Sequence, residues 1–189
     1  MSSTTGTRIV VAGLGGQGVL FATRLMAEAA LSTGQPALTS ETHGMAQRGG
    51  SVVASLKIGS FRSALVLDGS ADLLLSLDQG EARRNLAVLA PGARCLCSSA
   101  QPWDPTVRAA AGSADIGLYA VDAAGIALRL GAPVLANIAL LGALSVFPFA
   151  PVSPDALEQV LRRRSPPRVL KGNLAALAAG RSAGAAVLG

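Results

Sequence analysis

Gly13, Gly15 and Gly18 follow the spacing G-x-G-x-x-G, which holds a pyrophosphate in dinucleotide-binding proteins. They stand between a β-branched apolar run and a helical pattern, which is the context that the motif requires. N–H groups at such a helix start bind anions because they lack partners within the helix. Gly16 and Gln17 complete the loop, and Gln17 either donates toward a ligand or caps the turn. The loop is a candidate site for a phosphate-bearing ligand.

An acidic residue at the end of the second strand would complete a dinucleotide site, because it binds the adenosine ribose. Glu41 is the one candidate, but it lies further along the chain than the pattern prefers and opens a polar loop. Two interpretations of the glycine loop therefore stay open. One is a stand-alone NAD(P)-binding oxidoreductase, and the other is a tight strand-to-helix turn that binds no nucleotide.

The polar segment 41–50 carries the side chains best suited to acid–base and anion chemistry. His43 is the only histidine, and its loop is expected at the carboxyl end of a parallel strand, where ligand crevices form. Arg48 either binds a carboxylate or phosphate through two N–H groups or pairs with Glu41 and shapes the loop. His43 and Arg48 are thus catalytic or partner-contacting candidates. The rest of the candidate active-site loop is Glu41, Thr42, Gln47, Gly49 and Gly50.

Cys95 and Cys97 are the only cysteines, and two thiols alone complete neither an iron–sulfur cluster nor a tetrahedral zinc site. On a strand, residues two apart lie roughly 6.6–6.8 Å from each other, which is the far limit for a disulfide. We expect structural thiols in a reducing compartment. Asp68, Asp72 and Asp78 flank expected strand ends without a metal-binding spacing. No metal site is predicted.

Four segments carry a family resemblance, in the order 13–19, 41–52, 136–144 and 171–180. They read G-L-G-G-Q-G-V, E-T-H-G-M-A-Q-R-G-G-S-V, A-N-I-A-L-L-G-A-L and K-G-N-L-A-A-L-A-A-G. Together they resemble the signatures of the gamma domain of 2-oxoacid:acceptor oxidoreductases, and the second segment has the indolepyruvate form. The resemblance spans residues 8 to about 180, so it is far more specific than the glycine loop alone.

The resemblance implies the small subunit of an indolepyruvate or arylpyruvate ferredoxin oxidoreductase, acting in amino-acid catabolism. Such a subunit has no turnover alone. It completes the active site of a larger catalytic subunit, which decarboxylates the 2-oxoacid oxidatively to an acyl-CoA. Thiamine diphosphate, Mg and 4Fe-4S clusters are then bound by that partner, coenzyme A is a co-substrate, and ferredoxin accepts the electrons. This chain is expected to bind no cofactor alone, and coenzyme A or the partner is the expected contact of the glycine loop.

Apolar periodicity predicts an α/β fold, with a Rossmann-like and mostly parallel sheet flanked by helices and a helical C-terminal part. The first forty residues form one β-α-β unit, and residues 101–113 form a loop. The expected strands are residues 8–13, 37–40, 51–58, 63–67, 72–77, 93–98 and 117–121. The expected helices are residues 18–31, 79–89, 122–130, 134–147, 154–164 and 170–180.

Length and composition place these elements in one domain. The 189 residues are 50% hydrophobic but only 3% aromatic, so the core must consist of aliphatic side chains. Low charge leaves spare apolar surface, which a subunit interface would cover. We expect a single domain over residues 8–181, with a flexible N-terminus (1–7) and a flexible tail (182–189).

The net charge of +5 comes partly from a basic C-terminal region, which is best explained as a helix surface or a partner-facing surface. Trp103 and Tyr119 are the only residues of their kinds, so little is available for base stacking and nucleic acid is not an expected partner. The longest apolar stretch, 132–147, is too short for a membrane span. The N-terminus contains no hydrophobic signal region. The expected location is the cytoplasm.

Overall fold

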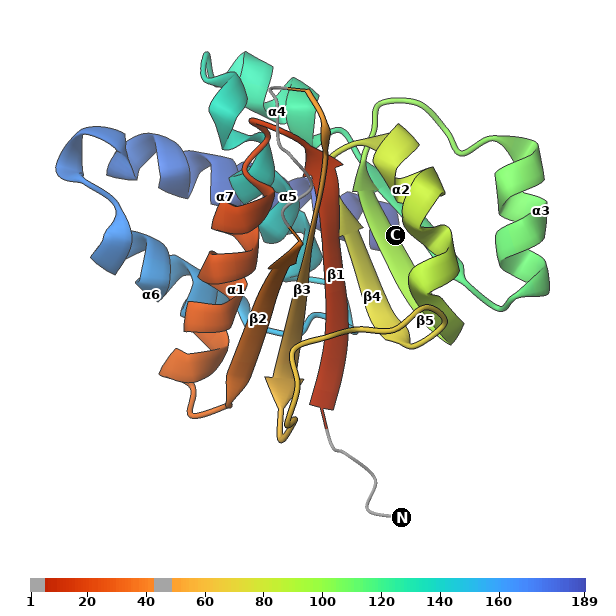
Figure 1. Ribbon diagram of the computed structural model, residues 1–189. Helices are drawn as coiled ribbons and strands as arrows, with labels where there is room; N and C mark the ends of the chain where they lie inside the picture. The colour runs from red at the N-terminus through yellow and green to blue at the C-terminus, as the bar shows by residue number, and fades with distance from the viewer. Residues whose placement is uncertain (1–5, 43–48) are drawn as a thin grey trace.

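A six-stranded sheet with the order β2-β3-β1-β4-β5-β6 forms the centre of the molecule. The computed structural model describes residues 6–42 and 49–189 (Figure 1). Strands β1, β4, β5 and β6 pair in parallel, whereas β3 is antiparallel to both β1 and β2. The strands are β1 (Gly6–Leu14), β2 (Ala37–Thr42), β3 (Ser51–Gly59), β4 (Ala71–Ser76), β5 (Leu89–Ser98) and β6 (Gly117–Val121). The predicted α/β class with a mostly parallel sheet is confirmed.

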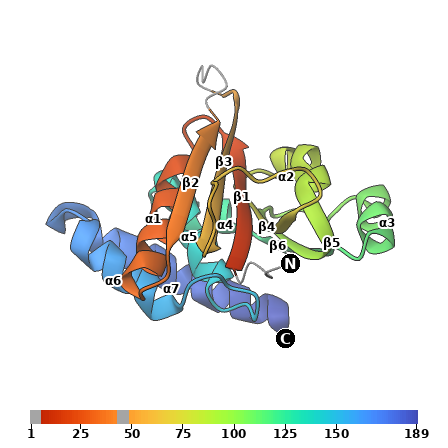
Figure 2. The same ribbon diagram turned by 60° about the horizontal axis from the view of Figure 1, so that its bottom comes forward.

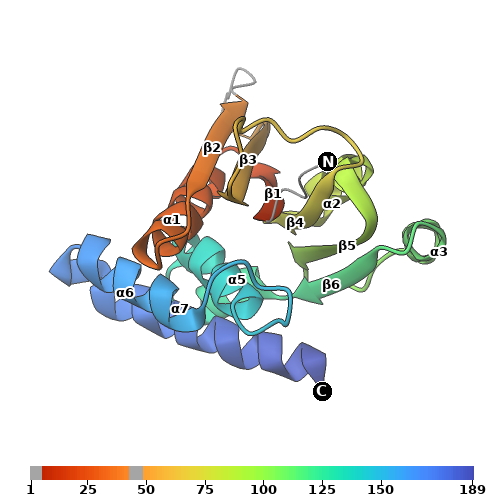
Figure 3. The same cartoon turned by 90° about the horizontal axis from the view of Figure 1, so that it is seen from below.

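Helices cover both faces of the sheet (Figure 3). Helices α1, α4, α5, α6 and α7 pack on one face, and α2 and α3 lie against the other. The α-helices are α1 (Val19–Ser32), α2 (Gln79–Asn85), α3 (Pro105–Ser113), α4 (Ala123–Arg129), α5 (Ala136–Leu144), α6 (Pro154–Arg164) and α7 (Pro167–Leu188). Two 3₁₀ turns, η1 (Leu86–Val88) and η2 (Pro133–Leu135), precede β5 and α5.

The central strands are buried on both faces, as parallel strands between two helical layers must be. Side chains alternate along β1: Ile9 and Val11 belong to the larger core under α1 and α5, and Val10 and Ala12 belong to the smaller core under α2. This double burial explains why the strand is an unbroken apolar run in the sequence.

The expected β-α-β unit is present, but a third strand is inserted into it. Strand β3 lies between β2 and β1, as Figure 2 shows. Ser55 of β3 faces Val10 of β1 on one side and Ser40 of β2 on the other. Because β3 is antiparallel to both neighbours, β1 and β2 remain parallel to each other. The loop between β2 and β3 therefore begins at the carboxyl edge of the parallel strands.

Two predicted elements were wrong. Residues 63–67 form no strand, and Leu65 and Leu67 are 60% and 65% exposed, so the apolar alternation here is not turned toward a core. Residues 101–113 are not all loop, because α3 occupies Pro105–Ser113. Asp104 caps α3 by accepting from the Thr106 N–H at 2.8 Å. Asp followed by Pro is a helix-start signal, which the turn formers of this segment, such as Pro102, Gly112 and Ser113, obscured.

Several boundaries also differ from the prediction. The helix expected over 79–89 ends as an α-helix at Asn85, and the turn former Pro91 lies inside β5. The helix expected over 134–147 is divided into η2 and α5 and ends at Leu144. Phe147 then packs on Tyr119, with ring centroids 5.0 Å apart. Phe147 thus contacts β6 from the segment that follows α5.

The last helix is longer than expected, because α7 continues to Leu188 through residues predicted to form a tail. Gly180 and Gly184 allow the backbone of α7 to lie directly on α5, where a Cβ would meet the carbonyl oxygens of Ala139 and Ala143. This close packing holds the end of the chain in helical form. In residues 6–42 and 49–189, every helix is too short or too polar to traverse a bilayer.

Candidate functional site

The glycine loop joins β1 to α1 at the carboxyl edge of the parallel strands. Gly16 and Gly18 have φ angles of +98° and +85°, which glycine adopts without the strain of a side chain. A Cβ on Gly13 would approach Gln17 Oε1 and Val19 Cγ2 to 2.9 Å. The motif glycines therefore meet local steric requirements, which are independent of any nucleotide.

Hydrogen bonds inside the protein use several of the loop's N–H groups. Leu14 N–H donates to Gln17 Oε1 at 2.7 Å, and Gln17 N–H donates back to the Leu14 carbonyl at 3.1 Å. Gly15 N–H donates to the Gly50 carbonyl at 2.8 Å. Of the two roles considered for Gln17, its side-chain oxygen thus caps the turn. These N–H groups are not available to a pyrophosphate, which weakens the dinucleotide interpretation.

The predicted active-site loop is attached to the glycine loop at its C-terminal end. Gly49 has a φ of +91°, and Gly50 accepts the bond from Gly15. Glu41 and Thr42 are the last residues of β2 and pair with β3. The structure therefore brings the start and the end of this loop to the carboxyl edge, beside the glycine loop. His43, Gln47 and Arg48 lie outside the described residues, so their roles stay predictions.

A buried carboxylate, which the sequence reasoning missed, also anchors the end of this loop. Glu81 is fully buried and accepts from Ser51 Oγ at 2.6 Å and from Arg84. Ser51 is the first residue of β3 and pairs with Leu14 of β1. Asp78 caps α2 by accepting from Glu81 N–H at 3.0 Å. The spacing of Asp78 and Glu81 is that of a capping box, which is the signal that could have located Glu81.

Asn137 connects the start of α5 to the glycine loop. Its Nδ2 donates to the Gln17 carbonyl at 3.1 Å, and a Cβ on Gly18 would clash with it. Asn173 Nδ2 donates to Ser165 Oγ at 2.8 Å and fixes the turn between α6 and α7. Each amide thus joins a helix to a loop or turn. The Oδ1 atom of Asn137 is buried and has no hydrogen-bond partner.

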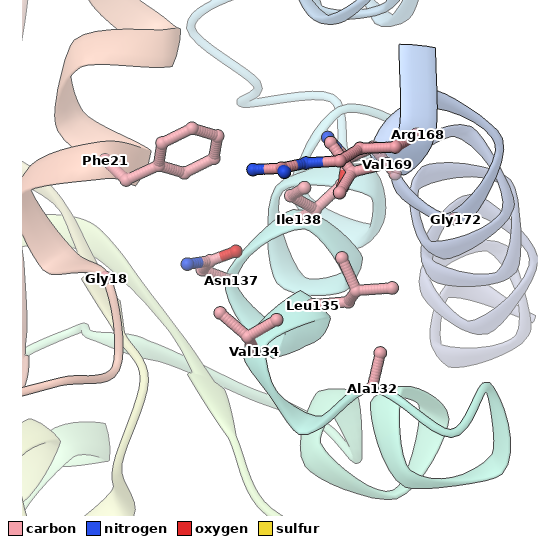
Figure 4. Close-up of a pocket in the computed structure, with 11 residues that line it drawn as sticks. Gly18, Phe21, Ala132, Val134, Leu135, Asn137, Ile138, Arg168, Val169 and Gly172 are labelled. Carbon is pink, nitrogen blue, oxygen red and sulfur yellow. The ribbon is translucent and has the colours of Figure 1, made fainter. Parts of the chain in front are cut away.

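A cavity of about 510 Å³ lies beside Gly18, between α1, α5 and α7 (Figure 4). Its walls are mainly apolar, with Phe21, Val134 and Ile138 among the lining side chains. Arg168 extends across the cavity toward Phe21 in Figure 4. The sequence reasoning did not identify this cavity.

Cys95 and Cys97 are free thiols, fully buried in β5, as expected for structural cysteines. Burial holds the pKa of Cys95 well above its usual range. Burial, with a smaller contribution from Asp78, raises the pKa of Cys97 to about 12. The two thiols are therefore protonated and unreactive near neutral pH. Among the described residues, no three His, Cys, Asp or Glu side chains converge as metal ligands.

The basic C-terminal region forms part of the helix packing. Arg162 and Arg181 both pair with Glu158, at 2.8 and 3.1 Å. Arg164 crosses from α6 to Glu28 of α1 and binds it through two N–H groups. These contacts agree with the helix-surface interpretation of the positive charge.

Comparison with known sequences identifies relatives along nearly the whole chain. The family described as pyruvate ferredoxin/flavodoxin oxidoreductase matches residues 8–183. Indolepyruvate oxidoreductase subunit IorB of Thermococcus kodakarensis is 35% identical over 198 residues, covering 96% of this chain and 97% of that protein. The subunit of the same name in Archaeoglobus fulgidus is 32% identical over 185 residues, covering 91% and 92%.

Solved structures share the fold. The pyruvate oxidoreductase subunit PORC of Thermotoga maritima superposes with a TM-score of 0.79 at 25% identity, covering 94% of this chain and 96% of that one. The gamma subunit of keto/oxoacid ferredoxin oxidoreductase from Geobacter sulfurreducens has a TM-score of 0.74 at 27% identity, with 95% and 99% covered. The sheet and its helical layers are thus common to these subunits.

Proposed function

The chain belongs to the pyruvate ferredoxin/flavodoxin oxidoreductase family, and we propose that it is the small subunit of an indolepyruvate-type 2-oxoacid oxidoreductase. The observation that carries this proposal is the match to curated indolepyruvate oxidoreductase subunits, at 32–35% identity over most of both chains. The preferred substrates are indolepyruvate and related arylpyruvates, which are decarboxylated oxidatively to acyl-CoA.

We assign the cofactors to a larger catalytic partner because the donor groups of this chain do not fit them. A 4Fe-4S cluster needs four thiolates, whereas this chain has two cysteines, both buried in its own core. The partner is proposed to hold thiamine diphosphate, Mg and the clusters, and to pass electrons to ferredoxin. The free buried thiols suit a reducing cytoplasm.

The proposed contribution of this chain is the loop between β2 and β3. Its C-terminal end is held by the bonds from Gly15 to Gly50 and from Ser51 to Glu81. Such anchoring favours a loop that presents His43 and Arg48 to the partner's active site. There the imidazole would bind or move a proton, and the guanidinium would pair with a carboxylate or phosphate. The glycine loop is proposed to contact coenzyme A or the partner.

The alternative, a stand-alone NAD(P)-binding oxidoreductase, is less favoured by the geometry. The loop N–H groups of Leu14, Gly15 and Gln17 already donate within the protein. The curated relatives carry the names of complex subunits. This alternative requires saturable NAD(H) binding and turnover by the purified chain.

The decisive experiment is coexpression with a thiamine-dependent large subunit of an indolepyruvate oxidoreductase from the same organism. We expect the two chains to copurify, and indolepyruvate- or phenylpyruvate-dependent reduction of ferredoxin to require both. NADH binding by the isolated chain is measured in parallel as a control. Absence of copurification with any thiamine-containing chain, or turnover by this chain alone, would contradict the proposal.

A further inference from the structure

The cavity between α1, α5 and α7 has the size and composition of a small-molecule site. Its volume is about 510 Å³, and ligand sites typically enclose about 300–1,000 Å³ with apolar walls and a few polar groups. Phe21 and Val134 remain 44% and 72% exposed at this cavity. Exposed apolar side chains that gather around a hollow are typical of a ligand-binding or interaction site.

An unpaired hydrogen-bond acceptor lies buried in the wall of the cavity. Asn137 is only 4% exposed, and its Nδ2 already donates to Gln17. Its Oδ1 has no partner among the described residues, and such a buried acceptor is costly. In Figure 4 this oxygen lies on the side of the amide that faces Ile138 and Arg168. It is shielded from solvent, so a rotation of the side chain would be needed to turn it into the cavity. A ligand with an N–H or O–H group would satisfy it.

Positive potential converges on the same cavity. Helices α1, α5 and α7 all begin there, at Gly18, Leu135 and Pro166. None of the three has a side-chain cap or an acidic residue in its first turn, whereas Asp or Ser caps α2, α3, α4 and α6. Helix N-termini attract anions.

Arg168 adds a full charge to these partial charges. Its guanidinium forms no ion pair with any residue in the described ranges. In Figure 4 it reaches across the cavity toward the Phe21 ring. A ligand between them would meet an aromatic face and a guanidinium, and below them the Asn137 oxygen.

We propose that this cavity binds a small organic carboxylate with an aromatic body and an N–H or O–H donor. The carboxylate would pair with Arg168, the ring would lie against Phe21 and Ile138, and the donor would reach Asn137 Oδ1. Indole and phenyl carboxylic acids have this chemistry. In naming aryl acids the inference rests on the proposed function, whereas the anionic and apolar character of the ligand follows from the cavity alone.

Filling the cavity from α7 provides the first test. Gly172 lines the cavity, and a Cβ there would lie 3.6 Å from Leu135 Cδ1, an ordinary contact. Gly172→Leu should therefore fold, because leucine favours a helix more than glycine does, and its side chain should occupy the ligand space. We expect indole-3-acetate to bind the full-length wild-type chain saturably in calorimetry, and Gly172→Leu to weaken this binding at least tenfold.

Charge is tested with Arg168→Gln and the matched control Arg108→Gln, which changes an exposed arginine on α3, against the opposite face of the sheet. We expect Arg168→Gln to weaken binding of indole-3-acetate about fivefold or more, with little effect on neutral indole-3-acetamide. Arg108→Gln should bind like the wild type. Absence of saturable binding, or binding that neither Gly172→Leu nor Arg168→Gln alters, would overturn the inference.

Two further outcomes separate this inference from the proposed function. If Gly172→Leu abolishes copurification with the large subunit while the free wild-type chain binds no aryl acid, the cavity receives a segment of the partner and the inference is wrong. If the chain binds aryl acids but supports no thiamine-dependent turnover with its partner, the proposed function fails and the cavity assignment stands. Turnover and ligand binding are therefore measured on the same preparations.

Discussion

At the scale of single residues, the site depends on pairs that are distant in sequence. Asn137 and Gly18 are in contact because the backbone of Gly18 takes a left-handed conformation and leaves no side chain in the way. Glu81 and Ser51 form a similar pair at the end of the candidate active-site loop. In the first pair a glycine leaves room for an amide, and in the second a serine hydroxyl donates to a carboxylate.

The pair Gly18 and Asn137 predicts a non-additive double mutant. Gly18→Ala should destabilise the fold by about 2–3 kcal/mol, because the left-handed conformation costs roughly 1–2 kcal/mol and the new Cβ displaces the Asn137 amide. With Asn137→Ala the clash disappears, so the double mutant should be more stable than the sum of the single effects predicts. Chemical denaturation measures all four proteins.

Gly16→Ala is the control for this cycle. Gly16 has a similar φ of +98°, but a Cβ there meets no atom within 4 Å. It should cost only the backbone term of roughly 1–2 kcal/mol and should be additive with Asn137→Ala. Strict additivity of Gly18→Ala with Asn137→Ala would show that the clash is relieved without cost.

The buried thiols predict alkaline destabilisation. The pKa of Cys97 is raised to about 12, mainly by burial. The pKa of a thiol in the unfolded chain is about 8.5. The unfolded state therefore releases its proton first. Stability from this thiol is complete below that lower pKa and is lost as the pH rises toward the folded value. At about pH 10 the loss is about 2 kcal/mol.

Comparison with Cys97→Ala isolates this contribution. The variant lacks the titrating group, so its free energy of unfolding should fall less than that of the wild type between neutral pH and about pH 10. Urea denaturation at each pH provides the values. Parallel pH profiles for the two proteins would contradict the burial of an un-ionised thiol.

At the scale of elements, α5 and α7 form the tightest helix pair. Gly142 of α5 and Gly180 of α7 each bring one backbone against the other helix, at the carbonyl oxygens of Leu177 and Ala139. Small residues at a helix crossing allow this distance, and any larger side chain forces the helices apart. Helix α5 is almost wholly apolar, and the close contact with α7 keeps one of its faces away from water.

The close pair predicts opposite effects for two glycines of α7. Gly180→Ala should destabilise the fold by about 2 kcal/mol or more, since overpacking against Ala139 exceeds the gain of about 1 kcal/mol in helix propensity. A Cβ on Gly172 would make only an ordinary van der Waals contact with Leu135, so Gly172→Ala should be neutral or stabilising by up to about 1 kcal/mol. Thermal unfolding compares them. Equal effects at both positions would rule out the close packing of α5 and α7.

At the scale of the whole molecule, three of the four segments that carry the family resemblance meet at the carboxyl edge of the sheet. The glycine loop, the end of the β2–β3 loop and the start of α5 meet there through Gly15, Gly50 and Asn137. The exposed apolar side chains Leu65 and Leu67 lie elsewhere, in the segment before β4.

Variants of the β2–β3 loop should lower turnover without preventing assembly with the large subunit. With the large subunit present, His43→Gln and Arg48→Gln should copurify normally and lower turnover at least tenfold, because the scaffold that holds the loop ends is unchanged. The readout is kcat and KM for indolepyruvate. Unchanged turnover in both variants would assign this chain a purely architectural role.

Local signals allowed much of the fold to be predicted. The apolar run of β1 and the caps Asp122 and Ser153 are visible in the sequence, because a strand period or a cap involves only neighbouring residues. The glycine loop was located in the same way, since its φ angles are local requirements.

What only the tertiary structure decided is which distant residues meet. The insertion of β3 between β1 and β2, the contact of Asn137 with the glycine loop and the Ser51–Glu81 bond all depend on the path of the chain. The cavity that we assign to an aryl carboxylate also depends on that path, because helices from three parts of the sequence begin around it. Periodicity specifies which face of an element is buried, but the partner of that face is selected only by packing the whole chain.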